Sequence, residues 1–149
     1  MAFIDYAHTP EEIAKVLSAL RLLCKGRLAI LFGCGGDRDR GKRPQMAAAA
    51  AEGADLLWLT SDNPRTEDPL AIIADMRAGL PEGREGVSVQ PDRRLAVREA
   101  LAALKEGDYL VIAGKGHEDY QEINHVKYPM TDKELLEEAI AVLSARRDS

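Results

Sequence analysis

The chain of 149 residues is 46% hydrophobic and 30% charged, which is typical of one soluble globular domain with a sizeable core. Its formal net charge of −5 argues against a nucleic-acid-binding protein, which normally carries a basic face, and the sequence shows neither an apolar run long enough to span a membrane nor a signal peptide. Cys24 and Cys34 match no zinc pattern and make no disulfide framework, so we expect a reducing cytoplasm.

The first third of the chain predicts a strand, a helix and a second strand. Apolar runs at residues 3–6 and 28–33 are typical of strands. A helix is expected over residues 10–24, because Thr9 suits an N-cap and Glu12 completes a capping box. The side chains expected to face the sheet are Ile13, Val16, Leu17, Leu20 and Leu23.

A second helix is expected to begin near Pro44. It continues through an alanine run at residues 47–51, and Gly53 is a plausible C-terminal stop. The alanines are best explained as a small, tightly packed helix face.

The rest of the chain continues this alternation and adds a hairpin. Apolar runs predict further strands at residues 54–60, 87–90 and 109–113. Periodicity and N-caps predict helices at residues 69–78, 92–105 and 131–146, with Asp68 as the N-cap of the first of them. Two short runs at residues 120–123 and 126–128, separated by Asn124-His125, are typical of a β-hairpin.

This order of elements predicts an α/β fold. We expect a Rossmann-like, mostly parallel sheet with helices on both faces, to which the hairpin near the C-terminus adds antiparallel edge strands. We expect residues 1–149 to form one domain. A motif so close to the start of the chain also suggests that further domains lie upstream.

The most informative motif is Asp62-Asn63-Pro64-Arg65, directly after the third predicted strand. Loops at the carboxyl ends of parallel strands are where α/β proteins bind ligands. An arginine fork suits a carboxylate, and Asp or Asn oxygens can accept from an ammonium group. The motif therefore suits a small zwitterion. Taken alone, however, so short a motif is better explained as an ordinary Asn-Pro turn with a solvated arginine, so a ligand site here depends on the other motifs.

A glycine-containing charged loop, residues 33–44, follows the second predicted strand. It lacks the Ser or Thr that a P-loop needs after Lys42, and it lacks the third glycine of a dinucleotide fingerprint. Gly35-Gly36 just after a core strand favours a binding loop over a mobile charge run. The charged side chains that could hold anions and carboxylates are Asp37, Arg38, Asp39, Arg40, Lys42 and Arg43.

Two further motifs stand at strand ends. In residues 5–10, Asp5 could accept from ribose hydroxyls, Tyr6 offers a face to a base, and His8 is a titratable donor. Equally, Asp5 and His8 could simply satisfy the helix entry.

In residues 114–120, Gly114 allows close approach by a ligand and Glu118 could pair with an ammonium. The alternative is a tight turn with Lys115 and His117 exposed. Three charged loops along one sheet edge favour a pocket. We expect no covalent catalysis and no metal site, because no nucleophile–base arrangement and no metal-ligand spacing stands out.

Together these motifs resemble the carboxyl-terminal domain of the Mur ligases, in the family's order and over essentially the whole chain. The Asp-Asn-Pro-Arg form is similar to that of the members that add meso-diaminopimelate. The resemblance implies a step of peptidoglycan synthesis. In that step ATP, with Mg²⁺, phosphorylates the terminal carboxylate of a UDP-N-acetylmuramoyl dipeptide, and the diaminopimelate amine then attacks the acyl phosphate.

The resemblance also implies residue roles. The residues expected around meso-diaminopimelate are Arg38, Asp62, Asn63, Arg65, Gly114 and Glu118. Those expected near the nucleotide are Asp5, Tyr6 and His8, with Asp5 at the ATP ribose. Arg38 and Arg65 would hold the far carboxylate and Glu118 the ammonium beside it, so that lysine would leave buried arginines unpaired.

The family's P-loop, magnesium ligands and UDP-sugar site belong to other domains, which would lie upstream. The resemblance therefore implies that the chain alone lacks ligase activity. Two alternatives stay open: a stand-alone Rossmann-like module that binds a nucleotide or an amino acid, and an oxidoreductase, which the poor dinucleotide fingerprint disfavours.

Overall fold

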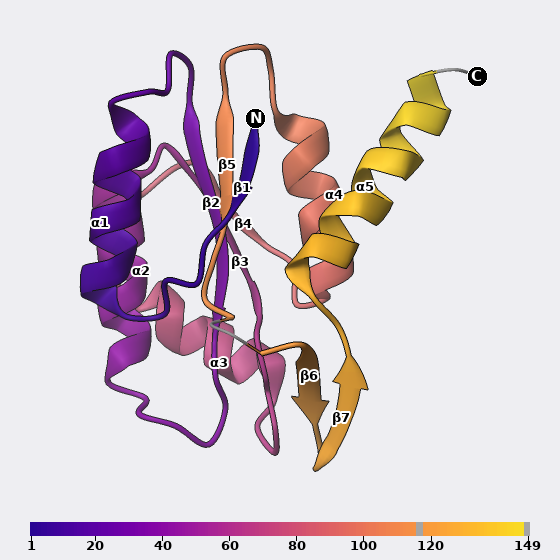
Figure 1. Ribbon diagram of the computed structural model, residues 1–149. Helices are drawn as coiled ribbons and strands as arrows, with labels where there is room; N and C mark the ends of the chain where they lie inside the picture. Colours follow the sequence, from indigo (N-terminus) through magenta and orange to yellow (C-terminus); the bar gives the residue numbers. More distant parts are fainter. Residues whose placement is uncertain (116–117, 148–149) are drawn as a thin grey trace.

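The computed structural model describes residues 1–115 and 118–147 (Figure 1). The strands of the main sheet are β1 (Ala2–Ile4), β2 (Leu28–Cys34), β3 (Leu56–Ser61), β4 (Val87–Val89) and β5 (Tyr109–Ile112). They pair in the order β1-β5-β2-β3-β4, and all pairs are parallel. The helices are α1 (Pro10–Arg21), α2 (Lys42–Gly53), α3 (Pro69–Arg77), α4 (Arg93–Ala103) and α5 (Asp132–Arg147).

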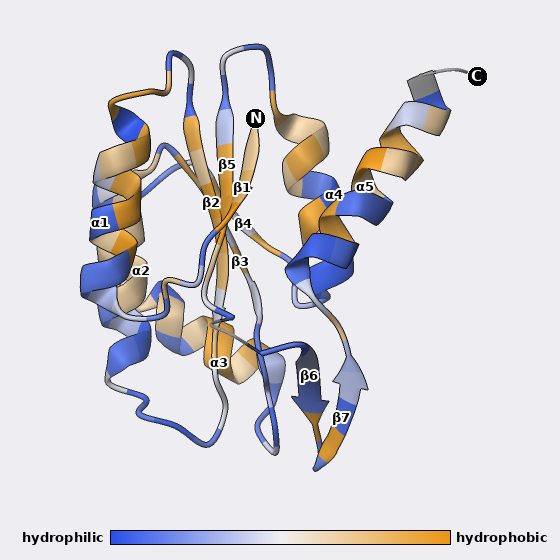
Figure 2. Ribbon diagram, in the orientation of Figure 1, coloured by the Kyte–Doolittle hydropathy of each residue, from blue (hydrophilic) through white to orange (hydrophobic). Residues whose placement is uncertain are grey.

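The helices cover both faces of the sheet, so the predicted α/β class is confirmed (Figure 1). Helices α1, α2 and α3 pack on one face, and α4 and α5 pack on the other. Figure 2 shows hydrophobic residues along the central strands and hydrophilic residues in the loop that follows β2. Among the described residues, no helix combines the length and apolar character needed to cross a bilayer.

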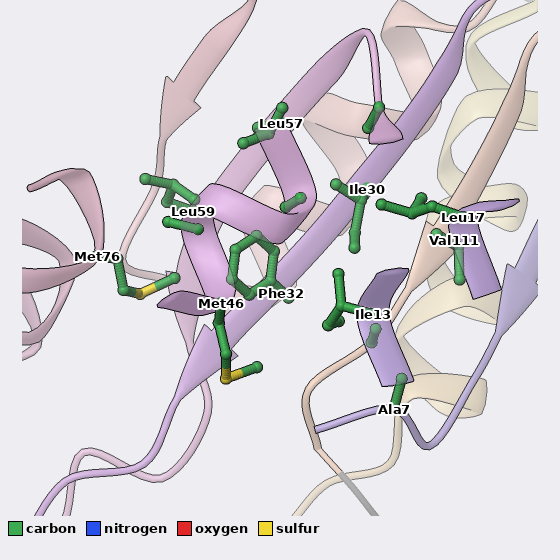
Figure 3. Close-up of a cluster of buried hydrophobic side chains, with 14 of the residues drawn as sticks. Ala7, Ile13, Leu17, Ile30, Phe32, Met46, Leu57, Leu59, Met76 and Val111 are labelled. Atoms are coloured by element: carbon green, nitrogen blue, oxygen red, sulfur yellow. The ribbon is translucent and has the colours of Figure 1, made fainter. Parts of the chain in front are cut away.

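The central strand β2 shows why both faces need cover. All seven of its residues are buried, and the side chains from Leu28 to Phe32 alternate between the two cores. Phe32 and Ile30 point toward α1 and α2, where they meet Ile13 and Leu17 (Figure 3). Leu31 belongs to the core on the α4 and α5 side. Side chains on a strand alternate between faces, so a strand buried on both sides reads as a continuous apolar run.

The alanine run of α2 forms the small face that the sequence predicts. Ala47 and Ala50 are completely buried. A Cβ atom at Gly53 would lie 2.8 Å from the Cβ of Leu17, so the two helices approach closely at this point. The helix begins at Lys42 rather than near Pro44. A proline in the first turn is tolerated there because first-turn N–H groups have no partner within the helix.

Two expectations about packing are wrong. Helix α1 ends at Arg21, and Leu23 is 65% exposed rather than facing the sheet. The hairpin, β6 (Tyr120–Ile123) and β7 (Val126–Pro129), forms a separate two-stranded sheet instead of adding edge strands. Its backbone bonds to the loop after β3: Arg65 N donates to Glu122 O at 2.9 Å, and Asn124 N donates to Arg65 O at 2.8 Å.

The other boundaries lie close to the predicted ones. Thr9 accepts from the backbone N–H of Glu12, and Asp68 accepts from that of Leu70, so both predicted N-caps are confirmed. The observed strand ends differ from the predicted ones by at most two residues, which is the normal uncertainty of element boundaries.

Candidate functional site

A cavity of about 440 Å³ opens at the carboxyl edge of the sheet, beside the loops that follow β2, β3 and β5. This volume is in the usual range for small-molecule sites. Six of the predicted site residues line it: His8, Arg38, Asp62, Arg65, Gly114 and Glu118. The parallel sheet brings these residues together because the carboxyl ends of its strands share one edge.

The loop after β2 is held in place by the loop after β3. Gly36 N donates to Asn63 O at 2.7 Å, and Arg65 Nη1 donates to Gly36 O at 2.9 Å. Thr66 Oγ1 donates to the Asp37 carboxylate at 2.7 Å. Asp37 and Arg65 both have left-handed backbone conformations, with φ of 54° and 53°. Non-glycine residues seldom adopt this conformation unless the surrounding structure stabilises it. The charged loop therefore has one defined conformation.

Arg43 has a structural role that the sequence does not reveal. The sequence groups it with the anion-binding side chains of the loop, but its side chain is almost completely buried. Its guanidinium donates to Glu67 at 2.6 Å, to Asp75 at 2.9 Å and to Gly35 O at 3.0 Å. These bonds use N–H groups on both terminal nitrogens of the guanidinium. Arg43 therefore connects α2 to α3 and to the loop after β2. Arg38 is the arginine of this loop whose exposed side chain remains for a ligand.

Asn63 lies behind the cavity rather than on its wall. It is fully buried, its Nδ2 donates to Glu118 Oε2, and its Oδ1 accepts from Glu122 N at 2.8 Å. Asn63 therefore orients Glu118 and attaches the hairpin to the site. Its predicted direct contact with an amino acid stays a prediction.

Asp62 and Lys115 form a buried pair of opposite charge on the cavity wall. Lys115 Nζ lies 3.8 Å from Asp62 Oδ1 and donates to Tyr120 O. Among the described residues, Asp62 Oδ1 has no hydrogen-bond partner, which suits it to a ligand donor. Burial raises the pKa of Asp62 to about 6, against the opposing effect of Arg93 and Lys115, and burial lowers the pKa of Lys115.

The buried Asp62 predicts a pH-dependent change in stability. Because burial raises its pKa from 3.8 to about 6, the folded chain binds more protons than the unfolded chain between these values. The contribution of Asp62 to the free energy of unfolding is therefore largest at low pH and falls as pH rises through about 6, by as much as about 3 kcal/mol. Denaturant titrations of wild type and Asp62→Asn near pH 4 and near pH 7 measure this effect. From pH 4 to pH 7 the free energy of unfolding of the wild type should fall relative to that of Asp62→Asn. If the difference between the two proteins were the same at both pH values, the expectation would be wrong.

The residues predicted near the nucleotide do not form one cluster. His8 lines the main cavity, and its Nδ1 lies 3.0 Å from Tyr6 O. Tyr6 lines a second hollow of about 340 Å³, which shares Lys115 and Glu118 with the first. Asp5 lines neither of these, and its Oδ1 accepts from Ala7 N at 2.8 Å, as expected for a helix entry. A nucleotide role for these three residues stays a prediction.

Comparison with known proteins decides the family. Residues 1–116 match the family model described as Mur ligase, glutamate ligase domain. The chain belongs to the Mur ligase family. One relative, from Ectopseudomonas mendocina, is 51% identical over 97% of the chain, and another, from Aquifex aeolicus, is 51% identical over 92%. Both are described as UDP-N-acetylmuramoyl-L-alanyl-D-glutamate-2,6-diaminopimelate ligases. The chain spans 30% and 28% of their lengths.

A solved structure of a ligase with the same description superposes closely on this Mur ligase domain. The TM-score is 0.92 at 47% identity, covering 96% of the chain and 29% of that protein. A Mycobacterium tuberculosis folylpolyglutamate synthase complexed with ADP shares the fold, with a TM-score of 0.60 at 22% identity, over 76% of the chain and 27% of that protein. The fold of this Mur ligase domain is therefore also found in a protein described as a folylpolyglutamate synthase.

The cavity of this Mur ligase domain holds one charged residue that sequence reasoning assigned only to a surface turn. Lys115 was expected to be exposed if its motif were a tight turn, but it is 4% exposed and lines both hollows. A lysine between two glycines directly after a core strand was the available signal. Gly116 and His117 of the same motif lie outside the described residues.

The Mur ligase site has no activated thiol. Burial raises the pKa of Cys34, which lines the cavity, to about 12, so the thiol stays protonated at neutral pH. Among the described residues, no group of three or more His, Cys, Asp or Glu side chains is placed to hold a metal ion.

Proposed function

We propose that this chain is the amino-acid-recognition domain of an ATP-dependent ligase that adds meso-diaminopimelate to UDP-N-acetylmuramoyl-L-alanyl-D-glutamate in peptidoglycan synthesis. Relatives about half identical to the chain carry that description, and the chain corresponds to under a third of their length. In the proposed reaction, ATP phosphorylates the terminal carboxylate of the UDP-linked dipeptide. The amine of diaminopimelate then attacks the acyl phosphate, an amide forms, and inorganic phosphate leaves.

The observation that carries the proposal is the placement of both arginines and the acids on one cavity. Arg38, Arg65, Asp62 and Glu118 all line it. One end of diaminopimelate carries a carboxylate and an ammonium side by side. The guanidinium groups suit the carboxylate, and Glu118, oriented by Asn63, suits the ammonium.

The same placement explains a preference against lysine. Lysine offers an ammonium but no second carboxylate at its far end. A bound lysine would leave the buried Arg65 without a ligand carboxylate, and a buried charge that lacks its partner costs several kcal/mol. Arg38 is exposed rather than buried as expected, so its share of this cost is smaller.

The proposal places most of the nucleotide site outside this chain. The Mycobacterium tuberculosis folylpolyglutamate synthase that shares this fold is complexed with ADP, so ATP is the expected co-substrate. In the family that the chain resembles, the magnesium ligands, the P-loop and the UDP-sugar site belong to other domains. We therefore assign Mg²⁺ and the UDP-linked dipeptide to other domains of the ligase, expect no turnover from this chain alone, and place the ligase in the cytoplasm.

The test is amino-acid selection by a ligase that carries this chain as its carboxyl-terminal part. Phosphate release would be measured with meso-diaminopimelate and with lysine at equal concentrations, and calorimetry would titrate the 149-residue chain with each. We expect kcat/KM at least about 100-fold higher for meso-diaminopimelate, in line with the cost of unpaired polar groups in a binding site. Equal use of lysine, or no reaction with either amino acid, would overturn the proposal.

A further inference from the structure

A buried ion pair lies behind the cavity and outside it. Arg93, the first residue of α4, is 1% exposed, and Asp132, the first residue of α5, is 6% exposed. Arg93 Nε donates to Asp132 Oδ1 at 2.8 Å, and Nη2 donates to Oδ2 at 2.9 Å. This two-pronged geometry is the strong form of an arginine–carboxylate pair, and it fixes the orientation of the guanidinium.

The same guanidinium holds the ends of two strands. Arg93 Nη1 donates to Ser61 O at 2.9 Å, and Nη2 donates to Ala113 O at 3.1 Å. The residues that follow these carbonyls in the chain are Asp62 and Gly114, both on the cavity wall. Strands β3 and β5 are not neighbours, because β2 lies between them. The two strands therefore share no backbone hydrogen bonds with each other. Arg93 connects their carboxyl ends instead, and it sets the distance between the two site loops that follow them.

Arg93 also acts on the charge of Asp62. Asp62 faces Lys115 and Glu118 from the loop after β5, Arg93 from α4, Asp132 from α5 and the thiol of Cys34 from β2. The two cations favour the carboxylate form of Asp62, while burial, Glu118 and Asp132 oppose it. Among these groups Arg93 has the largest charge effect on Asp62.

A second arginine–aspartate pair lies at the other end of the sheet. It does not line the cavity, so it provides a control for Arg93 and Asp132. Arg27 Nε and Nη2 bond to Asp108 at 3.1 and 2.6 Å, and Nη2 also donates to Ala103 O at 3.0 Å. Like Arg93, Arg27 pairs with a buried aspartate and donates to a backbone carbonyl, although its own side chain is 40% exposed. It lies at the start of β2, away from the cavity.

We propose that Arg93, paired with Asp132, is a positioning residue of the amino-acid site: it holds the carboxyl ends of β3 and β5 together and places a cation behind Asp62. This inference rests on the proposed function for its consequence in binding. It gives α5 a role in the site, because Asp132 lies beyond residue 116, where the match to the family model ends.

The experiment follows the titration of the Asp62 carboxyl group by NMR in the 149-residue chain. Arg93→Met removes the cation behind Asp62, so the Asp62 midpoint should shift upward by about one pH unit. Asp132→Asn removes an anion, so the midpoint should shift downward. Opposite signs distinguish electrostatic positioning from loosened packing, which would move both variants the same way. Arg27→Met should leave the midpoint unchanged.

Binding of meso-diaminopimelate near pH 7, measured by calorimetry on the same samples, tests the consequence. The dissociation constant should rise about tenfold in Arg93→Met and in Asp132→Asn, the effect of one lost positioning hydrogen bond, and stay unchanged in Arg27→Met.

An unchanged Asp62 midpoint in Arg93→Met, or an equal shift in Arg27→Met, would overturn the inference. If Arg93→Met does not fold, an upward or unchanged midpoint in Asp132→Asn would do so. Failure of the wild type to bind the amino acid would count against the proposed function alone, because the titrations still decide the role of Arg93.

Discussion

Replacement of Arg65 by lysine should raise the KM for meso-diaminopimelate by roughly 10- to 150-fold in a ligase that carries this chain. The loss of a charge-assisted hydrogen bond costs about 1.5–3 kcal/mol, and about 1.4 kcal/mol corresponds to a factor of ten. In the structure Arg65 Nη1 is already used by Gly36 O, and Nε lies 3.7 Å from Glu122 Oε1. Lysine has one ammonium in place of this fork, so it cannot hold Gly36 and also bind a carboxylate.

The measurement is steady-state kinetics with the amino acid and ATP varied in turn. The KM for ATP should change little, because the proposal places most of the nucleotide site in other domains. Arg21→Lys is the matched control, since Arg21 is an exposed arginine that pairs with Asp55 on the surface. An unchanged KM for meso-diaminopimelate in Arg65→Lys would remove Arg65 from the ligand site.

Gly36→Ala should both destabilise the fold and weaken amino-acid binding. A Cβ atom at this position would lie 1.9 Å from Pro64 O, a backbone atom that cannot rotate away. The loops after β2 and β3 would have to separate, and the hydrogen bonds of Gly36 N to Asn63 O and of Arg65 to Gly36 O would be lost. We expect a loss of about 2–4 kcal/mol in the free energy of unfolding, because overpacking and broken buried hydrogen bonds combine.

Thermal melting and calorimetric titration measure the two effects of Gly36→Ala. A loss of this size should lower the melting temperature by roughly 5–15 °C for a chain of this length. Binding of meso-diaminopimelate should weaken at least about tenfold, because Arg38 moves with the loop. Gly41→Ala is the control in the same loop, since its Cβ would meet only the Asp39 carboxylate, at 3.1 Å, which is a side-chain group rather than backbone. If both variants melted alike, the close contact between the two loops would be refuted.

The order of elements, their type and the edge that carries the site follow from the sequence. The unbroken apolar run in β2 indicates a strand buried on both faces, because side chains alternate and both faces must be covered. Thr9 and Asp68 predict helix starts through a purely local hydrogen bond. Parallel strands share a carboxyl edge, so charged loops at strand ends were expected to meet, and they do.

The roles of individual charged residues were decided only by the tertiary structure. Arg38 and Arg43 lie in one charged run, yet Arg43 is buried because Glu67 and Asp75, distant in sequence, surround it. Lys115 is buried because the loop after β3 places Asp62 beside it. Composition and periodicity report local propensity and average burial, whereas the pairing of two buried charges depends on distances set by the whole fold. The sequence therefore determined where the site lies, and the packing of the sheet and helices determined which charges support it and which remain for a ligand.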